Sequence, residues 1–255
     1  MTTGTVEHQA METYEIQYIF QLGGEKTETF NLRIDAQRLE LIREASTSPP
    51  DWAELGFRQC PHCPLDAATH PYCPVAVNLS DVVRRFNAVI SHDRIGLTVI
   101  TPDRQVYGQT TAQKGISSLL GLIFPTSRCP HTAFFRPMAR FHLPLATEAD
   151  TIFRVTGMYL LAQFFIRKNG KPEDVELEGL KQIYENMHII NMHMADRIRK
   201  ASVMDSSINA IIVLDVFTHV LPFAIEEQLE EIRYLFAPFF QPKSPAGAFR
   251  PGGDW

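Results

Sequence analysis

The chain has 255 residues, of which 45% are hydrophobic and 21% are charged. This composition is typical of a globular protein with a sizeable core and excludes an intrinsically disordered chain. The formal net charge of −5, without a broad basic region, argues against nucleic acid as a partner. The sequence contains neither a secretory signal pattern nor a long uninterrupted apolar stretch. We therefore expect a cytoplasmic protein without membrane insertion.

The N-terminal half predicts antiparallel hairpins. Apolar and polar residues alternate over residues 13–34 on both sides of a double-glycine turn, which is typical of a β-hairpin. Asp35 is expected to cap a short helix, and the preceding residues 1–12 are expected to be disordered. A second hairpin is predicted over residues 95–110. Residues 13–146 are therefore expected to form an α+β region.

The C-terminal half predicts three long helices. Thr147 and Asp150 have the spacing of a capping box, which marks the start of the first helix. The second carries an apolar stripe with alternating spacings of three and four, which indicates coiled-coil-like packing. The third is expected to begin near Asp205 or Ser206. The predicted fold is α+β, with N-terminal antiparallel hairpins and a four-cysteine knuckle followed by a C-terminal helical bundle over residues 147–240. Residues 241–255, rich in Pro and Gly, are expected to be a flexible tail.

A proline follows every cysteine of the chain, and the cysteines are Cys60, Cys63, Cys73 and Cys129. Two ligands separated by two residues can grip one ion, and distant ligands then cross-brace the segments that carry them. We therefore predict that these cysteines bind one metal ion together, with zinc preferred and an iron–sulfur cluster as the alternative. Three histidines could each replace one sulfur: His62, His70 and His131.

Other interpretations of the cysteines stay open. The tetrapeptide CPHC at residues 60–63 also resembles the active site of thiol oxidoreductases, although no thioredoxin-like pattern surrounds it. Pro64 stands where a zinc knuckle usually has glycine, which gives some weight to an iron–sulfur cluster. The cysteines could also be unligated thiols of the core.

Polar residues interrupt two helix faces that are otherwise apolar, and these residues are Asn191, Asp215 and His219. Buried polar groups need partners, so one interpretation is a structural hydrogen-bond network that sets the helix register. The other interpretation is a ligand site between the helices.

Three arginines follow the Cys129 turn within a stretch interrupted by proline, namely Arg136, Arg140 and Arg154. Such a group could clamp a carboxylate or a phosphate, or could form salt bridges with nearby acidic residues. Residues 197–200 form one of the longest basic runs, and that run is short.

The motifs CPxCPL, YCPVAVNL, CPHT, RPMARFHLP, N-x-x-x-x-D-R-I-R and DSSINAIIVLD occur in this order along the chain. This order resembles a bacterial family catalogued only as a domain of unknown function, over roughly residues 12–235. The resemblance implies no activity.

The expected function is therefore argued from residue chemistry. No nucleophile, base and oxyanion set can be assembled from the sequence, so a binding protein is favoured over an enzyme. We expect a metal-stabilised binding or regulatory protein that acts through protein partners and could form homo-oligomers. The alternative is a redox or ligand sensor that uses an iron–sulfur cluster, haem or reactive thiols.

Overall fold

The computed structural model describes residues 12–24, 26–43, 48–201 and 206–240. The disordered N-terminus and the flexible tail that the sequence predicts lie outside these described residues, apart from residue 12. Within them the protein has an α+β fold with a five-stranded antiparallel sheet and seven α-helices.

The sheet has the strand order β3-β2-β1-β4-β5. Its strands are β1 (Thr13–Gln21), β2 (Thr27–Asp35), β3 (Leu41–Ile42), β4 (Arg94–Ile100) and β5 (Gln105–Thr111). Both predicted hairpins are confirmed, as β1-β2 and β4-β5. Antiparallel pairing of β1 with β4 joins the hairpins into one sheet. Alternation places Tyr18 and Phe20 on the buried face, where Phe30 lies opposite Tyr18 in the register.

The short helix predicted after Asp35 is wrong. The Asp35 carboxylate does accept hydrogen bonds from the amides of Gln37 and Arg38, as a capping residue would. The chain then turns at Leu39, which has a positive φ of 55°, and returns as β3 to pair with β2. Pairing with an existing strand satisfies more backbone groups than one isolated helical turn.

The helices are α1 (Pro74–Arg85), α2 (Ala112–Thr126), α3 (Arg136–Arg140), α4 (Glu148–Lys168), α5 (Glu178–Ala201), α6 (Ser206–Ile232) and α7 (Ala237–Phe240). Three short 3-10 segments accompany them: η1 (Asp51–Ala53), η2 (Ala133–Phe135) and η3 (Arg233–Phe236). The predicted capping box at the start of α4 is present, with both of its hydrogen bonds. No helix in the described part of the chain is long and apolar enough to cross a membrane.

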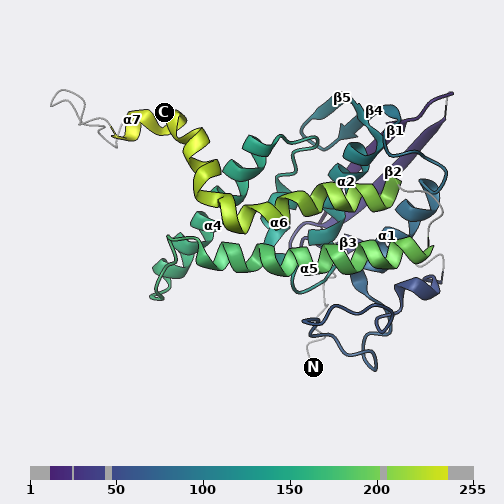
Figure 1. Cartoon of the computed structure of the whole chain (residues 1–255), viewed down its shortest axis with the longest axis horizontal. Helices are drawn as coiled ribbons and strands as arrows, with labels where there is room; N and C mark the ends of the chain where they lie inside the picture. The colour runs from purple at the N-terminus through teal and green to yellow at the C-terminus, as the bar shows by residue number, and fades with distance from the viewer. Residues whose placement is uncertain (1–11, 25, 44–47, 202–205, 241–255) are drawn as a thin grey trace, which may run out of the picture.

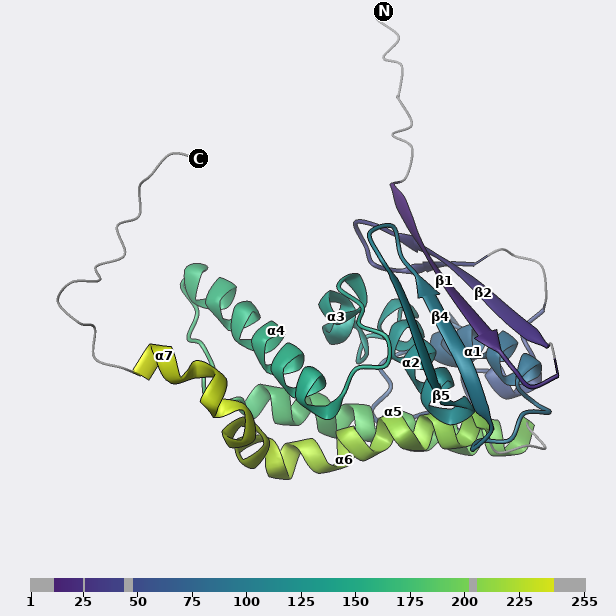
Figure 2. The same ribbon diagram turned by 90° about the horizontal axis from the view of Figure 1, so that it is seen from above.

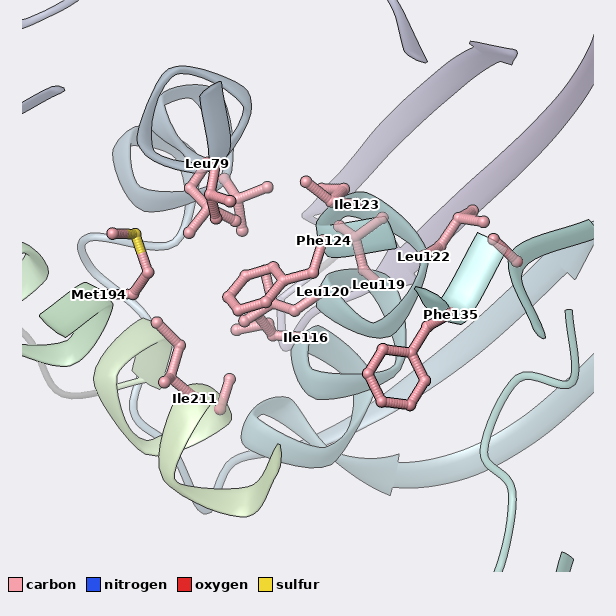
Figure 3. Close-up of a cluster of buried hydrophobic side chains, with 14 of the residues drawn as sticks. Leu79, Ile116, Leu119, Leu120, Leu122, Ile123, Phe124, Phe135, Met194 and Ile211 are labelled. Atoms are coloured by element: carbon pink, nitrogen blue, oxygen red, sulfur yellow. The ribbon is translucent and has the colours of Figure 1, made fainter. Parts of the chain in front are cut away.

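The core lies between the sheet and the long helices. Figures 1 and 2 show α5 and α6 running side by side, with α1 and α2 between them and the sheet. Side chains from four helices meet here: Leu79, Phe124, Met194 and Ile211 gather in one buried cluster (Figure 3). Apolar side chains of both predicted halves thus contribute to one core, while the domain boundary near residue 146 stays a prediction.

Candidate functional site

Cys60 and Cys63 lie in a loop that is closed at its base. Glu54 and Tyr72 form a β-bridge, and backbone hydrogen bonds join the residues that flank them. Inside the loop, the Cys63 amide donates to the Cys60 carbonyl at 3.0 Å, which fixes the C-x-x-C turn. Cys73 follows directly after the bridge. The loop geometry therefore brings three cysteines to one region.

Cys73 and Cys129 are each positioned by the end of a helix. Cys73 is the N-cap of α1, and Pro74 opens that helix, where its missing N–H leaves no group unsatisfied. Cys129 lies two residues past the C-cap of α2. Its carbonyl accepts hydrogen bonds from the amides of Thr132 and Ala133, both at 3.2 Å. These hydrogen bonds and the Pro74 cap restrict the backbone at both cysteines.

All four cysteines line the same small cavity, whose volume is about 20 Å³. All four are free thiols. Ile190, Met194 and Arg197 of α5 complete part of the wall. The volume is close to that of one water-sized sphere, so the cavity has room for a single ion.

The cysteines nevertheless do not form the compact cluster that the predicted knuckle requires. Among the described residues, no group of three or more His, Cys, Asp or Glu side chains is placed to hold a metal ion. The physical reason is that a neutral thiol is a small hydrophobe and only a weak hydrogen-bond donor, so packing alone does not draw sulfurs to a common centre. The four cysteines share a cavity without being clustered.

Burial has the largest effect on the pKa of two of these thiols, Cys60 and Cys129. Burial, and after it the negative charge of the other three cysteines, raises the pKa of Cys60 to about 12. Burial also raises the pKa of Cys129, but the backbone amides of His131 and Thr132 donate toward its sulfur and favour the thiolate. A cation in the cavity would act in the same direction as these amides.

Arg197 is a buried cation on the wall of this cavity, with 0% of its surface exposed. Its guanidinium donates to the carbonyls of Trp52 and Glu54, at 2.8 and 2.7 Å, and to that of Leu55 at 3.0 Å. Its Nε has no hydrogen-bond partner among the described residues. Burial lowers the pKa of Arg197, and three of the cysteines oppose this shift. The guanidinium therefore ties the base of the cysteine loop to α5.

The sequence alone does not single out Arg197, because it stands in a short basic run whose neighbour Arg199 is exposed. The feature of the sequence that could have identified Arg197 as buried is its spacing from the apolar stripe. Arg197 follows Met194 of the apolar stripe by three residues, which places it on the buried face of the helix.

The three candidate histidines occupy different surroundings. His131 lines the cysteine cavity, and its Nε2 lies 2.9 Å from the His62 carbonyl oxygen. The rings of His62 and His131 are 4.1 Å apart, and burial followed by the nearby His131 lowers the pKa of His62. His70 instead contacts Thr69 at the surface. His131 is thus the histidine of this set that lines the cavity.

The three arginines do not converge on one point. Arg136 forms a 2.9 Å ion pair with Glu40, which is the salt-bridge alternative that the sequence left open. Arg140 lies over the ring of Tyr14, with its guanidinium carbon 5.2 Å from the ring centre. Arg154 donates to two backbone carbonyls at the C-terminal end of α3. Of these three, Arg154 lines a cavity, which is described below.

The polar residues of α5 and α6 have separate partners. The Asp215 carboxylate lies within hydrogen-bond distance of Nδ1 of His188 on α5, at 2.9 Å, which joins the two helices. Asn191 is buried and lines the second cavity. The side chain of His219 lies outside the described residues. The predicted network of these residues therefore stays a prediction.

The second cavity has a volume of about 570 Å³ and lies between α2, α3, α4 and α5. His142 lies on its wall, and its Nε2 is hydrogen-bonded to the buried Tyr18 hydroxyl. Burial, and then the positive charge of Arg154, lowers the pKa of His142 to about 3. The neutral imidazole is therefore part of the folded state.

This neutral histidine predicts a loss of stability in acid. His142 takes up a proton on unfolding below its ordinary pKa of about 6.5, so acidification from pH 7 favours the unfolded state down to about pH 3. Between pH 7 and pH 5 this group alone removes up to about 2 kcal/mol of unfolding free energy, at about 1.4 kcal/mol per pKa unit. Urea unfolding at both pH values should show a smaller loss in His142→Asn. The exposed His70→Asn should behave as the unmodified protein; equal pH slopes in all three proteins would refute the assignment.

These features define an α+β protein in which four cysteines, two of them buried and two half-buried, share one small cavity with a buried arginine, and which has a larger second cavity. The chain belongs to the family described as a domain of unknown function (DUF6901), whose family model matches residues 16–237. The family resemblance drawn from the sequence motifs is thereby confirmed. No curated protein and no solved structure matches the chain.

Proposed function

We propose that this chain is a metal-stabilised binding protein in which the four cysteines, whose sulfurs do not surround a common centre in the structure, move together to hold one zinc ion. The observation that carries the proposal is the shared cavity, where free thiols from separate segments line a space of about 20 Å³. Four cysteine ligands make a closed structural zinc site, which stabilises a fold and leaves no coordination position open for catalysis. The function then resides in the surfaces that the metal holds in place.

Arg197 supports this proposal through its charge. Four thiolates around one Zn²⁺ carry two net negative charges, which are unfavourable in a buried site unless they are compensated. No described carboxylate pairs with Arg197, and the negative groups within its reach are three of the cysteines. A buried guanidinium with a free Nε beside these sulfurs supplies one of the two compensating charges.

The redox and cluster alternatives fit this geometry less well. A redox-active C-x-x-C pair places its first thiol at a helix N-terminus, which lowers the pKa of that thiol. Cys60 instead precedes a turn, and its pKa is raised to about 12. An iron–sulfur cluster contains several iron and sulfide atoms and needs more space than about 20 Å³.

Elemental analysis of protein purified without chelator or added metal tests this proposal directly. We expect about one zinc per chain, no absorption near 400 nm, and loss of the zinc in Cys73→Ser. The exposed His70→Ala should retain the metal. Several irons per chain, with absorption near 400 nm, would show that the cysteines hold an iron–sulfur cluster and not zinc. Folded protein without metal would refute the metal site.

An exposed apolar surface lies on α4, where five large apolar side chains are between 40% and 56% exposed: Phe153, Leu160, Leu161, Phe164 and Phe165. Their spacing places them on one face of the helix. Contiguous exposed apolar surface of this kind marks interaction sites. We call this face the α4 stripe.

The binding partner that the α4 stripe favours is a second copy of the chain, whose α4 packs antiparallel against it. The first turn of α4 contains Glu148 and Asp150, and the last turn contains Arg167 and Lys168. Antiparallel pairing places each acidic end against a basic end. Gly157 lies within the stripe, and a Cβ there would meet nothing within 4 Å, so the two helices can approach closely at this point.

Leu161→Glu is expected to dissociate this dimer. The substitution places two like charges in one two-fold interface and weakens association by at least about a hundredfold, as measured by sedimentation velocity. Tyr107→Glu changes an equally exposed residue of β5 outside the stripe and should remain dimeric. A protein that is monomeric at every concentration would contradict the assignment of the partner.

A further inference from the structure

The second cavity is built into one face of α2. Six residues of that helix line it at spacings of a single helical face, and they are Lys114, Ser117, Ser118, Gly121, Phe124 and Pro125. The middle of the face consists of small residues, whereas most other residues of α2 are buried and apolar. The volume of about 570 Å³ lies within the range of small-molecule sites.

Gly121 leaves part of this cavity open, although close packing does not require a glycine at this position. The other glycine of α2, Gly115, is explained by close contact with the sheet, because a Cβ there would lie 2.9 Å from Cδ1 of Ile95. At Gly121 a Cβ would meet no heavy atom within 4 Å. Glycine is the poorest helix former after proline, so a larger residue would stabilise α2. The helix therefore forgoes stability at the position where a side chain would enter the cavity.

A polar corner faces the same cavity. Tyr184 is 4% exposed and packs edge-on against Phe135, with ring centres 5.4 Å apart, but its hydroxyl has no hydrogen-bond partner among the described residues. Arg154 lies close enough to oppose the effect of burial on the pKa of Tyr184. The Arg154 guanidinium makes no ion pair with a carboxylate in the described part of the chain. Two donors, one of them cationic, are thus available to an incoming anion.

The remaining charges and walls define the shape of that anion. Exposed Lys114 adds a second cation, while the carboxylate that lines the cavity, Glu148, accepts a hydrogen bond from Gln228 at 3.0 Å. The charged residues that line the cavity are therefore Lys114, Arg154 and Glu148, which together carry a net charge of +1. Apolar walls are formed by Phe124, Phe135, Met138, Leu143, Leu145 and Met187.

We propose that this cavity binds an amphipathic monocarboxylate, with its aliphatic chain along the apolar wall and its carboxylate at Arg154 and Tyr184. One free hydroxyl and one guanidinium that already donates to two carbonyls suit a monoanion, whereas a phosphate dianion needs more donors. This inference depends neither on the zinc site nor on the dimer.

Isothermal titration calorimetry with dodecanoate, below its micelle concentration, tests the inference. We expect one dodecanoate per chain and binding at least tenfold weaker for dodecan-1-ol, which has the same chain without the charge. Tyr184→Phe and Arg154→Gln should each weaken dodecanoate binding about tenfold and leave dodecanol binding unchanged. Arg140→Gln removes a neighbouring arginine outside the cavity and is the matched control.

Gly121→Leu tests whether filling the cavity abolishes dodecanoate binding without destabilising the fold. The leucine side chain enters the open space, so dodecanoate binding should be lost while the melting temperature stays equal to or above that of the unmodified protein. Gly121→Ala should weaken binding less, because it adds only one methyl group. The proposal is overturned if dodecanoate and dodecanol bind equally, if neither binds, or if Gly121→Leu binds as the unmodified protein does.

Discussion

Replacing Cys129 with serine is expected to release the proposed zinc ion and to lower the free energy of unfolding by on the order of 5 kcal/mol or more. Cys129 follows α2, whereas the other cysteines lie in the loop and at the start of α1, so as a zinc ligand it would join separate parts of the core. Structural zinc supplies about 10 to 16 kcal/mol in small zinc peptides, and a larger core retains part of its stability without it. Urea unfolding at neutral pH measures the loss.

Chelator distinguishes loss of the metal from loss of a buried thiol. Treatment of the unmodified protein should reproduce the instability of Cys129→Ser, and the same treatment should have no further effect on the variant. His70→Ala, a surface histidine outside the cysteine cavity, should lose nothing under either condition. Full stability of the unmodified protein in chelator, with its metal removed, would show that the cysteines are only core thiols.

Arg197→Met is expected to cost about 3 to 5 kcal/mol of unfolding free energy, because it removes a buried guanidinium that donates to three backbone carbonyls, one of them fully buried. The carbonyls belong to the base of the cysteine loop, so this base should separate from α5. The same variant should bind zinc more weakly, since the charge that compensates the thiolates is gone. Unfolding curves and competition with a zinc indicator measure the two effects.

The role of Arg197 as a cation can be separated from its role as a donor. Arg197→Lys keeps the charge but cannot reproduce the guanidinium fork, so zinc affinity should recover more than stability does. Arg199→Met removes an exposed arginine two residues away and should change neither quantity by more than about 0.5 kcal/mol. If Arg197→Met is as stable as the unmodified protein, the guanidinium does not hold the loop.

Local rules in the sequence predicted much of the fold. Alternation of period two predicted β1 and β2, because one face of this hairpin is buried. The second hairpin, β4 and β5, was predicted from two strand-like runs on both sides of a turn. The capping box at Thr147 identified the start of α4, because a cap satisfies the amides of its own first turn. The error after Asp35 arose where a local cap signal competed with a long-range partner strand.

Less of the candidate site could be predicted from local rules in the sequence. The cysteine pattern singled out four residues that share a cavity, because proline-flanked C-x-x-C spacing is a local signal, but it did not show that their sulfurs lie apart. The three arginines after Cys129 do not lie together as one group. Arg136 and Arg140 are at the two ends of α3 and Arg154 is in α4, and Arg136 pairs with Glu40, far away in the sequence.

The sequence by itself therefore determined the α+β class, the hairpins, the α4 cap and the identity of the cysteines, since each depends on residues that are close along the chain. Only the tertiary structure decided that Arg197 is buried beside the thiols and that Gly121 borders an open space. It also placed Tyr184 of α5 and Arg154 of α4 on the wall of the same cavity. These features arise where helices distant in the chain meet, and the packing at such contacts is not encoded in any one segment.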